Sequence, residues 1–130
     1  MSNSSPAASV APVARAKPTV RFRLRISAGE DIAIGPGKIA LLEAIAETGS
    51  ITAAAKQIGM SYRRAWALLD ELNGALKRPA VDSIKGGPRG GGSALTAVGL
   101  QLIERYRQVE RTAREACAAD IRALVNMLAR

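Results

Sequence analysis

The spacing of apolar and polar residues changes along the chain, and each spacing predicts a different element. From Val20 to Ile26 the two kinds alternate, which predicts a half-buried strand. Asp31 to Ile34 predicts a short second strand, and Ala28-Gly29-Glu30 lies between them as the turn of a hairpin. The polar face of the first strand is open to solvent, to DNA or to a partner, and it carries Arg21, Arg23 and Arg25.

Between residues 36 and 76 the apolar positions recur every three or four residues, which predicts helices. Pro36 suits the first turn of a helix that runs to about Thr48. Ser50 is placed to cap a second helix, and Gly59 to end it in a left-handed conformation. Ser61 then caps a third helix that runs to about residue 76. Its inner face is formed by Ala65, Leu68, Leu69 and Leu72.

Two short helices joined at Gly59 are typical of a helix-turn-helix, in which the start of the second helix faces a DNA major groove. An ordinary helical hairpin with a solvated basic surface is the alternative. Arg63 and Arg64 favour DNA, because cations at a helix N-terminus oppose the helix dipole by a few tenths of a kcal/mol. A polyanion outside the protein would explain them. Trp66 is expected to pack in the core rather than stack on bases.

A glycine-rich basic segment follows the predicted helix-turn-helix. Val81 to Ile84 predicts a strand, Lys85 to Gly92 a tip, and Ser93 to Leu95 a returning strand. This layout is typical of a wing, in which Lys85 and Arg89 would contact the DNA backbone. A plain flexible loop remains possible. A phosphate-binding loop for a nucleotide is disfavoured, because the segment lacks a Gly-Lys-Ser/Thr ending that leads into a helix.

Thr96 is placed to cap a last helix, predicted from Ala97 to about Leu128. Such a helix would extend ~48 Å at 1.5 Å per residue, farther than a small domain can cover. Pairing with a second chain would bury its far half. The alternative is a helix broken near Cys117 that folds back on its own domain, with Cys117 itself expected to be buried. The apolar stripe consists of Val98, Leu102, Tyr106, Val109, Ala113, Cys117, Ile121, Leu124 and Leu128.

Composition narrows the possible functions. The 130 residues suit one domain, and the net charge of +8 suits a nucleic acid or an anionic surface. The chain has no His and one Cys, so we expect no metal, no cofactor and no enzymatic activity. No apolar run approaches the ~20 residues of a membrane span, so we expect no membrane partner. The first residues are not typical of a signal peptide, because Arg15 and Lys17 follow the Ala/Val stretch instead of preceding it, so we expect a cytoplasmic protein. Residues 1–19 are rich in Ser, Ala and Pro, which predicts a disordered tail.

Four segments together resemble a known family. They are Gly-Pro-Gly-Lys-Ile-Ala-Leu-Leu-Glu-Ala-Ile, Thr-Gly-Ser-Ile-Thr-Ala-Ala-Ala, Met-Ser-Tyr-Arg-Arg-Ala-Trp-Ala-Leu-Leu-Asp-Glu-Leu-Asn and Gly-Gly-Gly-Ser-Ala-Leu-Thr-Ala-Val-Gly. Over residues 21 to 116 the chain resembles the winged helix domain of the molybdate-responsive regulators (ModE). The hairpin alone is also similar to the LysR-type regulators.

The resemblance implies a dimeric domain that binds an inverted repeat in double-stranded DNA, with a link to molybdate or molybdenum metabolism. Full-length family members carry molybdate-binding domains after the long helix. No oxyanion site is evident in the printed sequence up to Arg130, so we expect no bound small molecule. The residues expected to contact DNA are Ser50, Thr52, Ser61, Tyr62, Arg63, Arg64, Lys85 and Arg89. Those expected in dimerisation are Val98, Leu102, Tyr106, Val109, Ile121, Leu124 and Leu128.

The sequence therefore predicts a mainly helical winged helix-turn-helix. Residues 20–95 would form the DNA-binding domain with its N-terminal β-hairpin, and 96–130 the long dimerisation helix. The predicted function is a transcriptional regulator, with residues 61–76 in the major groove and 85–92 on the backbone. The alternative is a dimeric adaptor that uses the same fold to bind a protein partner. Such an adaptor would show no salt-dependent affinity for duplex DNA.

Overall fold

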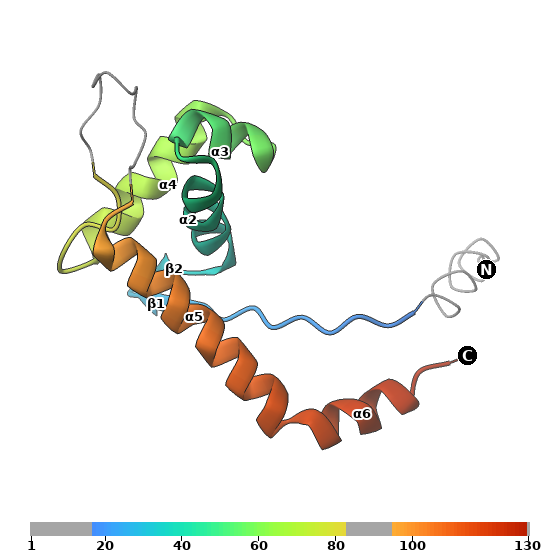
Figure 1. Ribbon diagram of the computed structural model, residues 1–130. Coiled ribbons are helices and arrows are strands. Elements are labelled where there is room, and N and C mark those ends of the chain that lie inside the picture. Colours follow the sequence, from blue (N-terminus) through green and yellow to red (C-terminus); the bar gives the residue numbers. More distant parts are fainter. Residues whose placement is uncertain (1–16, 83–94, 130) are drawn as a thin grey trace, which may run out of the picture. The chain divides into compact units, whose positions relative to one another are not determined.

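The computed structural model describes residues 17–82 and 95–129, which form two compact units. The first unit is Arg23–Glu110, and the described residues of the second are 17–22 and 111–129. The predicted wing tip and most of the N-terminal tail lie outside the described residues. The elements are β1 (Ile26–Ala28), β2 (Asp31–Ile34), α2 (Pro36–Thr48), α3 (Ile51–Gln57), α4 (Tyr62–Ala75), α5 (Ala97–Ala116) and α6 (Ala118–Asn126) (Figure 1).

The predicted hairpin is present, but its first strand is shorter than expected. β1 and β2 pair antiparallel, with Ala28 opposite Asp31 and Ser27 opposite Ile32, and a bulge follows towards Ile26. The turn uses Gly29 in a left-handed conformation, with φ of 66°. The prediction of a strand from Val20 to Ile26 was wrong, because the four residues of β2 can pair with only a short partner.

The apolar residues before β1 pack on side chains instead of joining the sheet. In the first unit, the Leu24 carbonyl accepts a hydrogen bond of 2.8 Å from the Tyr106 hydroxyl. In the second unit, Arg114 donates to the Val20 carbonyl at 3.1 Å and lies over the Phe22 ring at 5.2 Å. From residue 20 to residue 25 the predicted alternation therefore survives as a burial pattern, in which the apolar residues are half-buried and the arginines are exposed, whereas Ile26 in β1 is exposed. The half-buried residues are Val20, Phe22 and Leu24, and the exposed ones are Arg21, Arg23 and Arg25.

The core of the first unit lies where α2, α3 and α4 meet. Pro36 occupies the first turn of α2 and the helix ends at Thr48, as the sequence predicted. Gly49 follows as its C-cap in a left-handed conformation, with φ of 86°. The long buried side chains lie on both α2 and α4, so the two helices share one core. Its largest fully buried members are Ile39, Leu41, Leu42, Ile45, Leu69, Leu72 and Val81.

The start of α5 packs tightly against the segment that follows α4. Thr96 accepts a hydrogen bond of 3.1 Å from the Gly99 amide, which confirms its predicted capping role. The Thr96 amide donates to the Ala80 carbonyl at 3.0 Å, and a Cβ on Gly99 would collide with that same oxygen. Val81 and Leu95 form an antiparallel bridge at the two ends of the predicted wing.

The helix expected from Ala97 to about Leu128 is present as two helices that meet at Cys117. Its φ of −104° and ψ of 13° depart from helical values, although its amide still donates to Ala113 at 3.0 Å. The thiol of Cys117 is exposed, so the expectation that it is buried was wrong. After Cys117 the apolar stripe has no fully buried member on α6.

Candidate nucleic-acid interface

The turn between α3 and α4 is built from local hydrogen bonds that the sequence predicted. The Ser50 hydroxyl accepts from the Ala53 amide at 3.0 Å and caps α3. Gly59 adopts φ of 71°, and the Met60 amide then returns to the Ala55 carbonyl at 2.9 Å. The Ser61 hydroxyl accepts from the Arg64 amide at 3.1 Å and caps α4. These bonds fix where α4 begins and which of its residues come first.

Burial of one face of α4 leaves its first turn open to solvent. Ala65, Leu69 and Leu72 each have 0% exposure. Tyr62 is 51% exposed, and Arg63 and Arg64 are both exposed. In the part of the chain that the structure describes, neither arginine pairs with a carboxylate. The N-terminus of α4 therefore presents two uncompensated cations, the arrangement that a phosphate backbone would neutralise.

Tyr62 and Trp66 form an aromatic pair beside these arginines. Their ring centroids lie 6.3 Å apart and the planes meet at 77°, an edge-to-face contact. Trp66 is half-buried and packs against the core, as predicted. The contact with Trp66 therefore leaves about half of the Tyr62 side chain exposed.

The other predicted DNA contacts lie at the start of α3 or outside the described residues. Thr52 is exposed in the first turn of α3, next to the half-buried cap Ser50. Both residues are thus at a helix N-terminus, where backbone N–H groups favour an anion. Lys85 and Arg89 fall within 83–94, outside the part of the chain that the structure describes.

A buried lysine holds the far half of α4, and sequence reasoning missed it. Lys38 is 7% exposed, and its Nζ donates to the Ile32 carbonyl at 2.6 Å and lies 3.2 Å from Glu71 Oε1. The Glu71 side chain itself remains 63% exposed. The sequence does contain a signal for the burial of Lys38. Lys38 stands four residues before Leu42, and residues four apart share one face of a helix.

Asn73 connects α4 to the base of the predicted wing. Its Nδ2 donates to the Val81 carbonyl at 3.0 Å, and its Oδ1 accepts from the Ala80 amide at 2.8 Å. Both polar ends of one side chain are therefore used by one neighbouring segment. This contact fixes where the chain leaves towards the wing relative to α4.

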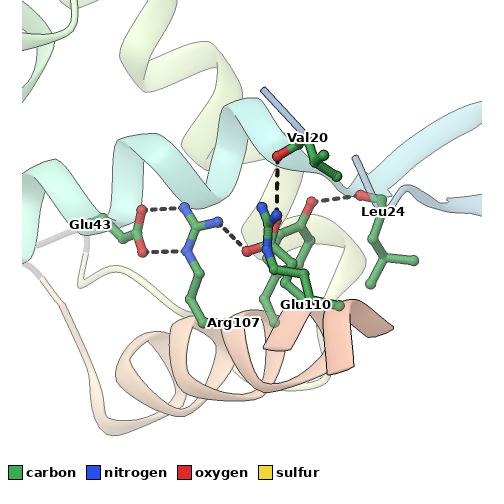
Figure 2. A network of polar contacts seen from close by, with 7 residues as sticks. Val20, Leu24, Glu43, Arg107 and Glu110 are labelled. Atoms are coloured by element: carbon green, nitrogen blue, oxygen red, sulfur yellow. Dashed lines mark hydrogen bonds and ion pairs between the residues drawn. The ribbon is translucent and has the colours of Figure 1, made fainter. Parts of the chain in front are cut away.

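An ion-pair network joins α5 to α2 within the first unit (Figure 2). Arg107 donates to Glu43 through Nε at 2.7 Å and through Nη2, and to Glu110 through Nη1 at 2.6 Å. The hydrogen bond with Glu43 is the main cause that raises the pKa of Arg107 above its usual value. A bidentate pair of this kind fixes orientation as well as distance, so α5 is held in one register on α2.

The residues predicted for dimerisation differ in their surroundings. Tyr106 is 4% exposed, and its hydroxyl donates to the Leu24 carbonyl. Its side chain is therefore part of the core of the first unit. Val98 and Leu102 are half-buried, and Leu102 packs against the core. Among the others, Ile121 is half-buried, and those that remain exposed are Val109, Leu124 and Leu128.

Within 17–82 and 95–129, no group of three or more His, Cys, Asp or Glu side chains is placed to hold a metal ion. Across the same two ranges, no helix is long and apolar enough to cross a bilayer.

Comparison with known proteins identifies the class of the capped hairpin. Residues 37–100 match the family model of bacterial regulatory helix-turn-helix proteins of the lysR family. This match covers α2, α3, α4 and the start of α5, which are the elements that form the hairpin and its core. The first unit is therefore similar, over these elements, to bacterial regulatory helix-turn-helix proteins.

Individual relatives make the resemblance more specific, and the chain is similar to the ModE regulators. The DNA-binding transcriptional dual regulator ModE of Escherichia coli strain K12 is 36% identical over 96 residues, which are 72% of this chain and 37% of that protein. The molybdenum transport protein ModE of Azotobacter vinelandii is 40% identical over 92 residues, 69% of this chain and 34% of that protein. The molybdenum-pterin-binding protein MopB of Rhodobacter capsulatus is 44% identical over 77 residues, which are 59% of this chain and 28% of that protein. The chain thus spans about a third of the length of these relatives.

Proposed function

We propose that the protein is a DNA-binding transcriptional regulator linked to molybdenum metabolism. The observation that carries the proposal is the exposed pair Arg63 and Arg64 at the capped N-terminus of α4. The match to regulatory helix-turn-helix proteins and the similarity to ModE support the same function. A regulator of this class acts in the cytoplasm, where bacterial DNA lies, and needs no enzymatic activity.

In this proposal α4 enters the major groove with its N-terminus first. A guanidinium of Arg63 or Arg64 can donate to both O6 and N7 of guanine, which discriminates against other bases by about 1–3 kcal/mol. Ser61 and Tyr62 contact phosphates and set the register of the helix. Ser50 and Thr52 contact the backbone from the start of α3, and Lys85 and Arg89 contact it from the wing.

A homodimer on an inverted repeat completes the proposal. Leu124 is 64% exposed and Leu128 is 54% exposed, which supports a partner for the end of the chain. A second copy would cover these residues and place two recognition helices in successive major grooves, about 34–36 Å apart. Val109, 49% exposed on α5 in the first unit, is proposed as a further dimer contact.

Binding of the full chain to its own upstream DNA, measured by gel shift across a salt series with and without molybdate, tests the proposal. We expect sequence-selective binding that weakens steeply with salt, because bound phosphates release counterions. Arg63→Ala with Arg64→Ala should lower the specific affinity at least about tenfold. Arg105→Ala removes an exposed arginine from α5 and is the matched control.

The outcomes separate the possible functions. Unchanged operator affinity in the double variant would contradict the role of α4. No binding by the intact chain under any condition would overturn the proposal and favour an adaptor that binds a protein partner. A shift caused by molybdate would show that the chain itself takes part in sensing.

A further inference from the structure

The outward face of α4 is defined by the residues opposite its buried face. Positions i, i+4 and i+7 of a helix share one face, so Ala67 and Asp70 lie in line with Arg63. All three are exposed, whereas Ala65 and Leu69 between them are fully buried. Arg64 is turned ~100° away from this line, because each residue of an α-helix rotates by that angle. The face that can enter a groove therefore begins with Arg63 and continues with Ala67.

Ala67 differs in its chemistry from the other exposed residues at the start of α4. Tyr62, Arg63 and Arg64 carry hydrogen-bonding groups, while Ala67 presents only a methyl group. In the major groove, the one apolar group on a base edge is the C5-methyl of thymine. Among the four bases, thymine is therefore the one that offers an apolar partner to a methyl group on the recognition helix.

The distance along the helix sets where that partner would lie. Ala67 follows Arg63 by four residues, a rise of about 6 Å. One base step along a strand is about 3.4 Å, so the two residues address positions about two base pairs apart. The short side chain also leaves room for α4 to approach the groove closely at this turn.

We propose that Ala67 is a specificity-determining residue that contacts the methyl group of a thymine about two base pairs from the position contacted by Arg63. This inference rests on the proposed DNA-binding function. It adds a base preference that no charge or hydrogen bond at Ala67 could supply. Removal of the thymine methyl group should weaken binding about three- to fivefold at that position, the loss expected for one buried methyl.

The test begins with the full chain and a pool of random DNA duplexes, from which bound sites are selected and sequenced. Each thymine of the selected site is then replaced by deoxyuridine, which lacks only the methyl group. Dissociation constants are compared for the wild type, for Ala67→Gly and for Ala75→Gly, which makes the same change at an exposed residue near the end of α4.

We expect one thymine whose demethylation weakens the wild type and Ala75→Gly about three- to fivefold but leaves Ala67→Gly unaffected. Each ratio is taken within one protein, so the cost of glycine in a helix cancels. If Ala67→Gly fails to fold, Ala67→Ser replaces it, since a hydroxyl beside the thymine methyl removes the apolar contact.

Two results would contradict the inference in distinguishable ways. If sites are selected but no thymine shows a methyl effect that depends on residue 67, the role of Ala67 is wrong and the proposed function stands. If the full chain selects no site, the proposed function fails, and the role of Ala67 fails with it.

Discussion

The helices α4 and α6 have similar sequence patterns but different surroundings. Both place apolar residues every three or four positions. On α4 the apolar face is closed, with Leu69 and Leu72 at 0% exposure. At the end of the chain Leu124 remains 64% exposed, and α6 has no buried residue. An amphipathic pattern thus predicts a helix and its apolar side, but not what covers that side.

The difference follows from the two compact units. In the first unit, α4 contacts α2, α3 and β2, which together form the core. In the second unit, none of the described residues is buried. A helix of nine residues is marginal without packing, because isolated helices need about 12–15 residues to be stable in water. This contrast is why we propose that a second copy covers α6.

The largest expected effect contrasts one leucine from each helix. Leu69→Ala should lower the free energy of unfolding by about 2–5 kcal/mol, because it leaves a cavity in a closed core. Leu124→Ala should change it by less than about 0.5 kcal/mol in dilute protein, since the side chain is already exposed. Denaturant unfolding monitored by circular dichroism measures both.

Protein concentration then sharpens this test. A dimer held by α6 would make the wild-type melting temperature rise with concentration, and Leu124→Ala should remove the rise. A large loss of stability for Leu124→Ala in dilute protein would show instead that α6 is covered within its own chain.

The next prediction compares the stability changes caused by the same substitution at two glycines that differ in their surroundings. Gly99→Ala should destabilise the protein by about 1–3 kcal/mol, because the new methyl group meets the Ala80 carbonyl oxygen. Gly74→Ala on α4 meets nothing within 4 Å and should stabilise it by about 0.5–1 kcal/mol through helix propensity. Thermal unfolding of the two variants tests the pair, and equal effects would mean that α5 does not pack closely there.

Local features of the candidate site were predictable from the sequence, because each depends on neighbours within a few residues. Ser61 bonds to the amide three positions on, and Gly59 needs only its own backbone conformation. Contacts between distant residues were not predictable in this way. Lys38 binds Glu71 across 33 positions (71 minus 38), and Arg107 binds Glu43 across 64. No local pattern states which of several charged residues will meet.

The strand before the hairpin shows the same limit. Alternation from Val20 to Leu24 correctly indicated which side chains would be half-buried. It could not indicate that Tyr106 and Arg114 would donate hydrogen bonds to backbone carbonyls of this segment in place of a neighbouring strand. Periodicity predicts the sidedness of a segment, whereas its hydrogen-bond partner depends on the rest of the fold.

A smaller effect compares how α4 and α6 begin. Ser61→Ala should cost about 1 kcal/mol, because the Arg64 amide loses its acceptor. Cys117→Ser should restore no equivalent cap on α6, since φ of −104° and ψ of 13° differ from the extended conformation of Ser61. The free energies of unfolding of the two variants, compared with that of the wild type, test both capping predictions. A gain of stability for Cys117→Ser would show that α6 can be capped after all.

The smallest effect concerns the pH dependence of stability, to which Tyr106, buried in the core of the first unit, contributes. Burial is the main cause that raises the pKa of Tyr106 above the ordinary 10.0, and Glu110 adds to it. The folded protein therefore retains a proton that the unfolded chain releases, so stability is full below pH 10 and falls as pH rises above it.

Tyr106→Phe should lower the free energy of unfolding by about 0.5–1.5 kcal/mol at neutral pH and should reduce the loss of stability at alkaline pH. Unfolding measured from pH 8 to 11 tests this, with Tyr62→Phe as the control that keeps Tyr106. If Tyr106→Phe loses stability above pH 10 as steeply as the control, the alkaline loss originates elsewhere, and Tyr106 does not hold its proton within the core.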